Sequence, residues 1–156
     1  MNKQIMLGQL HAMQEFFDRS TGSLDDGDSG VCPAEGMFTA AGQIAHVAQT
    51  VDWFMTGAFA EGGFTMDWEG MEKQVRAVTT ISHAREWFAN AMARAKAAVE
   101  AHSEAEWAAA LPAGPIMGGM PRASILGAMT DHTAHHRGAL TVYARLQGKT
   151  PPMPYM

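Results

Sequence analysis

Residues 125–146 read ILGAMTDHTAHHRGALTVYARL, the clearest helical pattern in this chain. Side chains along one stripe of this stretch are spaced three or four residues apart, as one face of an α-helix requires. The stripe consists of Ile125, Met129, His132, His136, Leu140 and Tyr143. Because His132 and His136 lie one helical turn apart, their imidazoles project from the same face and can bind one metal ion.

Three further segments show helical spacing of apolar residues, and none of the chain alternates with the period of a β-strand. We predict helices at about residues 2–18, 40–60, 81–102 and 122–147, with Thr39 as an N-cap and Gly148 as a C-cap. The pattern of residues 64–78 is ambiguous between loop and a short helical piece. Four amphipathic helices joined by long connections predict an all-α fold, a four-helix bundle that forms a single domain over residues 1–156.

The composition limits the partners that this protein can have. The net charge is −5, and the basic residues are scattered, so the surface lacks the concentrated positive charge that nucleic acid requires. No segment approaches the length of about 20 apolar residues that spans a bilayer. Cys32 is the only cysteine, which excludes an intrachain disulfide and a thiolate zinc cluster. We therefore expect a cytoplasmic protein that binds neither nucleic acid nor membranes and takes a small molecule as its partner.

A metal ion of the zinc type needs at least three protein ligands, so a third ligand must come from another helix. His46 is the best candidate, because it lies within the predicted helix 40–60 among core-type residues. We therefore predict a metal site formed by His46, His132 and His136, with zinc or nickel as the ion, since imidazole suits both. The alternative is that these histidines are hydrogen-bonded core residues that bind no metal.

Three other residues are candidates for the same site. Trp53 could form a wall of a pocket, and Tyr143 could donate a proton, although core packing is the favoured role for both, since large aromatic residues usually fill bundle interiors. Asp52 could be a further ligand or a hydrogen-bond partner of a ligand. A metalloprotease is not predicted, because Thr133 stands where the helical protease motif requires glutamate after its first histidine.

The histidine-rich run 132–140 resembles the fourth-helix signature of the DinB/YfiT-like superfamily. The spacing of Thr39, His46 and Trp53 is similar to the pattern of that family's second helix, and Gly148-Lys149-Thr150-Pro151-Pro152 is similar to its usual ending. The resemblance implies a four-helix bundle in which one histidine from helix 2 and two from helix 4 hold a divalent metal. These roles match His46, His132 and His136. Ala139 departs from the pattern, since the family often has glutamine there.

The resemblance also implies a homodimer and a link to small thiols. Members with assigned activity include bacillithiol S-transferases and a mycothiol-dependent isomerase, while many members have no known activity. Three neutral nitrogens leave a divalent ion with its positive charge and an open coordination position, which can bind a thiolate or lower the pKa of a water molecule. A metal-dependent thiol S-transferase is thus the leading hypothesis. The alternatives are a metal-dependent hydrolase, a non-catalytic metal-binding or sensing bundle, and a helical interaction protein without metal.

Overall fold

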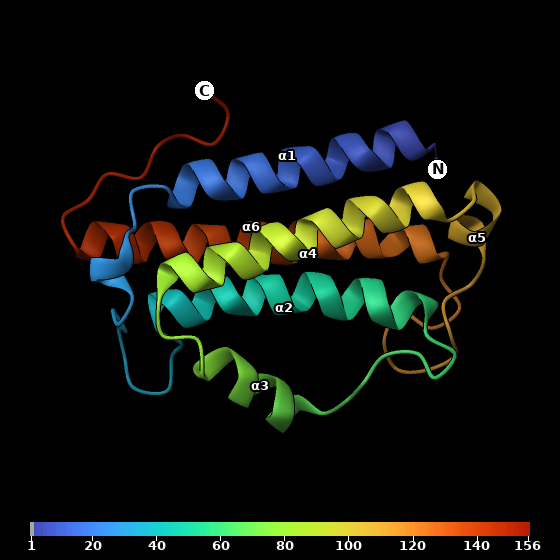
Figure 1. Ribbon diagram of the computed structural model, residues 1–156, viewed down its shortest axis with the longest axis horizontal. Helices are drawn as coiled ribbons and strands as arrows, with labels where there is room; N and C mark the ends of the chain where they lie inside the picture. Colours follow the sequence, from blue (N-terminus) through green and yellow to red (C-terminus); the bar gives the residue numbers. More distant parts are fainter. Residues whose placement is uncertain (1) are drawn as a thin grey trace.

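The computed structural model describes residues 2–156 and shows an all-α protein. Four long helices form the bundle that the sequence predicts (Figure 1): α1 (Lys3–Thr21), α2 (Ala40–Phe59), α4 (Ile81–Ala101) and α6 (Ile125–Leu146). Two short α-helices and two 3₁₀ turns lie in the connections: α3 (Trp68–Arg76), α5 (Glu104–Ala108), η1 (Asp26–Asp28) and η2 (Arg122–Ser124). Within residues 2–156 no strand forms, and the only β-type pairing is an isolated bridge between Ala110 and Pro121.

The order of the helices around the bundle places α2 between α4 and α6, and α1 on the opposite side between the same two helices. Figure 1 shows α2 and α4 running in one direction, and α1 and α6 running in the other. Because α2 and α4 are parallel, the chain must return along the bundle before α4 begins. The returning segment, residues 60–80, contains α3, which lies beside α2 outside the four-helix core (Figure 1).

The ends of α2 and α6 show why these helices begin and end where they do. Thr39 accepts a hydrogen bond from the backbone N–H of Gly42, which confirms it as the N-cap of α2. At the end of α6 the C-cap is Gln147, and Gly148 follows it with a φ of 72°. Backbone hydrogen bonds from Gly148 and Lys149 close this end as a Schellman motif, so Gly148 occupies the position after the cap.

Two elements go beyond the prediction. The ambiguous stretch 64–78 contains a regular helix, α3, capped by Asp67. Helix α5 lies in the connection between the predicted helices 81–102 and 122–147, and it buries Trp107 completely. Its signal is a capping box, in which Ser103 and Glu106 each bind the other's backbone N–H.

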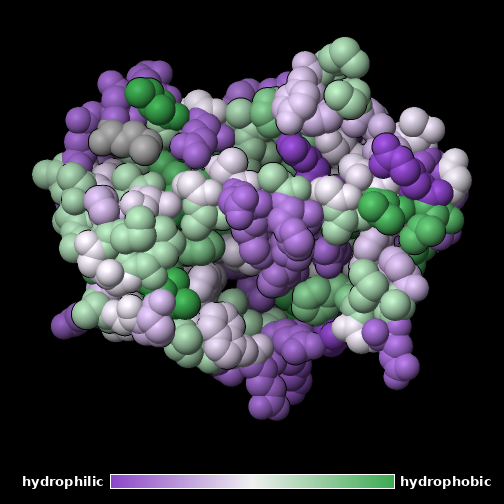
Figure 2. Space-filling model, turned by 180° about the vertical axis from the view of Figure 1, so that it is seen from behind, coloured by the Kyte–Doolittle hydropathy of each residue, from purple (hydrophilic) through white to green (hydrophobic). Residues whose placement is uncertain are grey.

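The surface of the molecule combines hydrophilic and apolar regions. Figure 2, which views the molecule from behind, shows hydrophilic residues gathered in the middle of that face and apolar residues toward its ends. None of the helices formed by residues 2–156 combines the length and the apolar character that crossing a membrane requires.

Candidate metal centre

Three histidines from two neighbouring helices meet inside the bundle. His46 projects from the middle of α2, and His132 and His136 project from adjacent turns of α6. Nε2 of His132 lies 3.2 Å from Nε2 of His46 and 3.1 Å from Nε2 of His136. One nitrogen of each ring lies within 4.8 Å of the other two, and all three rings are half-buried. The structure therefore brings together the three residues that the sequence predicted as ligands.

These separations suit a shared ion. Imidazole nitrogens bind zinc at about 2.0–2.1 Å, so two of them on one ion lie about 2.9 Å apart at a right angle and about 3.3 Å apart at the tetrahedral angle. The measured separations of 3.1 Å and 3.2 Å fall between these values. Without an ion, the same separations suit N–H···N hydrogen bonds between neutral imidazoles, which is the metal-free alternative.

The Nδ1 atoms of the rings also bear on whether the cluster suits a metal ion. Nε2 of Gln43 lies 2.7 Å from Nδ1 of His136. With this amide turned by 180°, its oxygen accepts from Nδ1–H, and the lone pair on Nε2 of His136 is left for an ion. Nδ1 of His132 is buried and has no hydrogen-bond partner among the described residues, while its Nε2 lies 3.5 Å from the hydroxyl of Thr50. The close approach of Nε2 of His132 to the other two rings and the side-chain partner of His136 fit a divalent ion, whereas Nδ1 of His132 adds no such support.

Burial keeps these histidines neutral. Desolvation, followed by the proximity of the other histidines, lowers the pKa of His132 to about 4 and that of His136 to about 3. Desolvation also lowers the pKa of His46. At neutral pH the cluster therefore presents unprotonated nitrogens, the form that binds a metal ion.

A cavity of about 360 Å³ lies directly beside the cluster. His46 and His132 form one part of its wall, and residues of α2 and α3 form most of the rest. Trp53 lies in this wall, as the sequence suggested, and its indole N–H donates to the backbone oxygen of Thr65 at 2.9 Å. Trp53 also lines a second cavity of about 380 Å³, whose lining includes Asp52 and Trp87.

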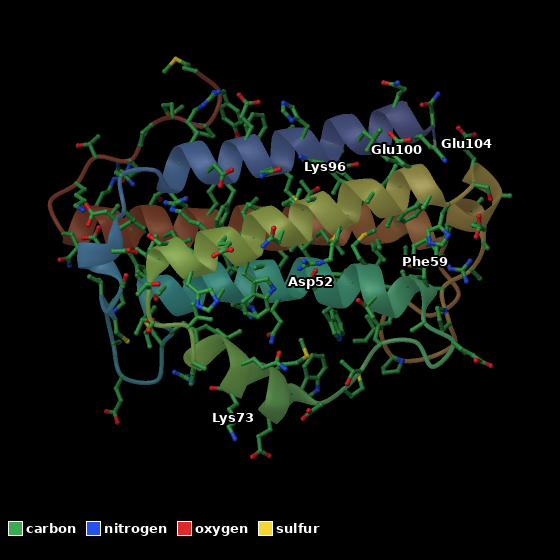
Figure 3. All side chains as sticks on the ribbon, viewed as in Figure 1. Asp52, Phe59, Lys73, Lys96, Glu100 and Glu104 are labelled. Atoms are coloured by element: carbon green, nitrogen blue, oxygen red, sulfur yellow. The ribbon has the colours of Figure 1, made fainter. Side chains whose placement is uncertain are left out.

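Tyr143 and Asp52 have other partners. Tyr143 is buried, and its hydroxyl donates to the backbone oxygen of Phe38 at 2.9 Å, so its contacts favour the packing role over proton donation. Asp52 lies where α2 and α4 run side by side (Figure 3). Its carboxylate accepts hydrogen bonds from Trp87 and from Arg94, both on α4, at 2.8–3.0 Å. Asp52 therefore ties two helices together and is not part of the histidine cluster.

The remaining histidines and the cysteine stay outside the centre. His135 is exposed on α6, although its ring packs edge-on against that of His136. His102 stacks on Phe59 at the far end of the molecule. Cys32 is exposed in the loop before α2, where its thiol lies near the backbone oxygen of Ala34.

Gln43 and Thr50 were missed from the sequence. Both lie on the same stripe of α2 as His46, three residues before it and four after it. Polar residues at this spacing on a helix as apolar as α2 are a usable signal, because a buried amide or hydroxyl requires a partner. Both side chains are buried in the structure.

Comparison with solved structures shows the same fold in a known enzyme. The chain is similar to the crystal structure of a mycothiol-dependent maleylpyruvate isomerase, with a TM-score of 0.71 and 17% sequence identity over 90% of this chain. A histidine-to-alanine mutant of that isomerase gives a TM-score of 0.70 and 15% identity over the same share. This chain covers 61% of the length of the isomerase chain in each case. At such identity the likeness concerns the fold alone.

No curated protein matches the sequence. The family model described as the DinB family matches residues 17–156, which include every helix from α2 onward and all three clustered histidines. The all-α bundle and the three-histidine cluster agree with that match. Since the match extends over most of the sequence, the chain belongs to the DinB family.

Proposed function

We propose that this protein binds one divalent transition-metal ion through Nε2 of His46, His132 and His136 and acts as a metal-dependent thiol S-transferase. The observation that supports the metal site most strongly is the approach of the three nitrogens to within 3.1–3.2 Å of their neighbour. When bound there, zinc or nickel supplies a positive charge and a vacant coordination position that lowers the pKa of a thiol or a water molecule.

The chain's own residues serve three purposes in this proposal. The neutral imidazoles leave the charge of the ion uncompensated, because none of the three ligands is an anion. Gln43 holds the ring of His136 through Nδ1 and so fixes the direction of its Nε2. The adjoining cavity, whose lining surface is mainly apolar, admits a small molecule beside His46 and His132.

The proposed reaction transfers the sulfur of a thiol to a carbon atom. In S-transfer the sulfur of a thiol forms a bond to an electrophilic carbon, while the bond from that carbon to its leaving group breaks and the leaving group keeps the electron pair. The proton of the thiol passes to solvent. Thiol chemistry is favoured here by the resemblance of the fold to an enzyme whose name specifies a thiol cofactor.

The test begins with metal content. Protein without a histidine tag, purified without a nickel column, should contain or take up about one equivalent of zinc or nickel per chain. Content below about a tenth of an equivalent, with no uptake on titration, would contradict the metal site and favour a bundle without metal.

The metal-loaded protein is then assayed with glutathione, bacillithiol or mycothiol and 1-chloro-2,4-dinitrobenzene as the electrophile. We expect turnover that chelation abolishes and that His136→Ala lacks. Ester hydrolysis without any thiol would instead support a metal-dependent hydrolase. Metal uptake without turnover under either condition would favour a non-catalytic metal-binding or sensing role.

We also propose that the protein is a homodimer, as the family resemblance implies. Light scattering coupled to gel filtration should give twice the chain mass of 16.8 kDa. A mass equal to that of one chain at micromolar concentration would contradict this proposal.

A further inference from the structure

The cavity beside the histidines has a wall of flat and polarisable side chains. Its lining includes Phe38, Trp53, Phe54, Trp68 and Met71. Trp53 occupies the centre of this wall, because its ring lies 4.9 Å from that of Phe54 and 5.6 Å from that of Trp68. Phe38 extends the wall to the metal centre, with its ring 5.3 Å from the imidazole of His46. Such surfaces favour aromatic partners, which pack against them edge-on or in offset stacks.

Two polar groups in this wall, on Gln49 and Glu72, already have partners. The amide N–H₂ of Gln49 donates to the backbone oxygen of Met71 at 2.9 Å and to the side chain of Gln74 at 3.1 Å. The carboxylate of Glu72 pairs with Nε of Arg76 at 2.8 Å. A ligand therefore gains little from hydrogen bonds to these groups unless it displaces them.

Positive charge is absent from the described residues that line the cavity. The nearest guanidinium on α3, that of Arg76, pairs with Glu72, packs over the ring of Phe38 and donates to the backbone oxygen of Gly36. Lys73, also on α3, points away from the bundle (Figure 3). Away from the histidine end, where the proposed ion would bind, the cavity holds one carboxylate and no free cation, so this part of it disfavours the carboxylate groups of an anionic ligand.

We infer that the substrate of this site carries an uncharged aromatic group of one or two rings, which occupies this cavity while a thiol or other donor atom on the substrate reaches the histidine end. The donor atom in this inference rests on the proposed function. The aromatic group does not. The volume of about 360 Å³ supports the size, because a dry engineered cavity of about 150 Å³ already accommodates benzene. The aromatic wall supports the ring, and the lack of cations supports its neutrality.

The first arm of the test uses Co²⁺-loaded protein and three thiol probes. Benzyl mercaptan carries an uncharged ring, 2-mercaptoethanol carries only a short hydroxyethyl group, and 6-mercaptohexanoate carries a carboxylate too far from its sulfur to close a small chelate ring on the same ion. Titration is followed through the visible absorption of the cobalt. We expect benzyl mercaptan to bind at least about tenfold more tightly than either of the other thiols.

Substitutions test whether the preference for benzyl mercaptan depends on the aromatic wall of the cavity. Trp68 is 50% exposed, so Trp68→Ala should leave the fold intact. The variant should weaken the binding of benzyl mercaptan by about tenfold and leave the affinity for 2-mercaptoethanol unchanged. The matched control is Tyr155→Ala, because Tyr155 is an exposed aromatic residue that packs on Phe16 away from the cavity. Trp68→Arg should shift the preference toward 6-mercaptohexanoate.

The second arm uses the metal-free protein, with benzyl alcohol and succinate as probes and saturation-transfer NMR as the readout. We expect transfer to benzyl alcohol, which Trp68→Ala reduces and Tyr155→Ala does not, and no transfer to succinate. If the protein takes up no cobalt but this arm succeeds, the proposed function fails and the aromatic site stands. If benzyl mercaptan shows no preference, or benzyl alcohol receives no transfer that depends on Trp68, the aromatic site is wrong even when the metal binds.

Discussion

Nε2 of His46 and Nε2 of His132 lie 3.2 Å apart, although 86 residues separate them in the chain. The two atoms meet because α2 and α6 are neighbours in the bundle and each turns a histidine toward the other. His136 joins them from the next turn of α6. This approach turns two local patterns into one candidate metal centre, and it can be tested one ligand at a time.

Loss of one ligand should remove the metal. We expect His136→Ala to lower the affinity for zinc by at least about 100-fold, because only two nitrogens remain for the ion. Isothermal titration calorimetry measures the change. His135→Ala is the control, since His135 is exposed and adjacent in sequence, and it should keep about one equivalent of bound zinc. Equal affinity in the two variants would refute the ligand role of His136.

Gln43 should support the metal through His136. Gln43→Leu removes the hydrogen bond to Nδ1, so the ring loses its fixed orientation, and we expect zinc affinity to fall by about 10–100-fold. The control is Gln49→Leu, because the amide of Gln49 bonds to Met71 and Gln74 and not to a histidine. If Gln49→Leu weakens zinc binding as much as Gln43→Leu, the orienting role of Gln43 is disproved.

Gly57 should be required for the close approach of Phe64 to α2. A Cβ atom at Gly57 would lie 2.2 Å from Cδ1 of Phe64, whose ring packs on Trp53 at 4.9 Å. We therefore expect Gly57→Ala to lower the free energy of unfolding by about 1–3 kcal/mol, measured by urea denaturation.

A second glycine provides the control, because replacing any helical glycine by alanine also stabilises the helix itself. Gly8 is exposed in the interior of α1, and a Cβ there would meet no heavy atom within 4 Å. Gly8→Ala should raise the free energy of unfolding by about 0.5–1 kcal/mol. A stabilising effect of Gly57→Ala of the same size would show that Phe64 yields without cost.

The stability of the metal-free protein should fall in acid. The pKa of His132 drops to about 4 and that of His136 to about 3 in the folded chain, while histidine in the unfolded chain titrates near pH 6.5. Below about pH 6.5 the unfolded state therefore binds protons that the folded state does not. Linkage then requires the free energy of unfolding to decrease as the pH falls from 7 toward 4.

Urea denaturation of chelator-treated protein at several pH values measures this dependence. In His136→Leu the number of protons taken up on unfolding between pH 6 and pH 4.5 should be smaller by up to about one. An unchanged proton uptake in this variant would mean that His136 titrates normally in the folded protein.

Features set within one helix were predictable from the sequence. Apolar spacing located the four long helices, Thr39 marked the start of α2, and the four-residue spacing of His132 and His136 placed them on one face. These features depend on the 3.6-residue turn and on hydrogen bonds between near neighbours, which any helix of the same sequence reproduces.

Contacts between helices were decided only by the tertiary structure. Helix α2 is buried on nearly every side, so its sequence does not tell which face meets α6, α4 or α3. The partner of Asp52 on α4 and the contact of Gln43 with His136 both depend on that choice. The cavity depends further on the return of residues 60–80 alongside α2, which sets α3 against it. Periodicity records how much of a helix is buried, whereas the identity of its neighbours results from the packing of the whole chain.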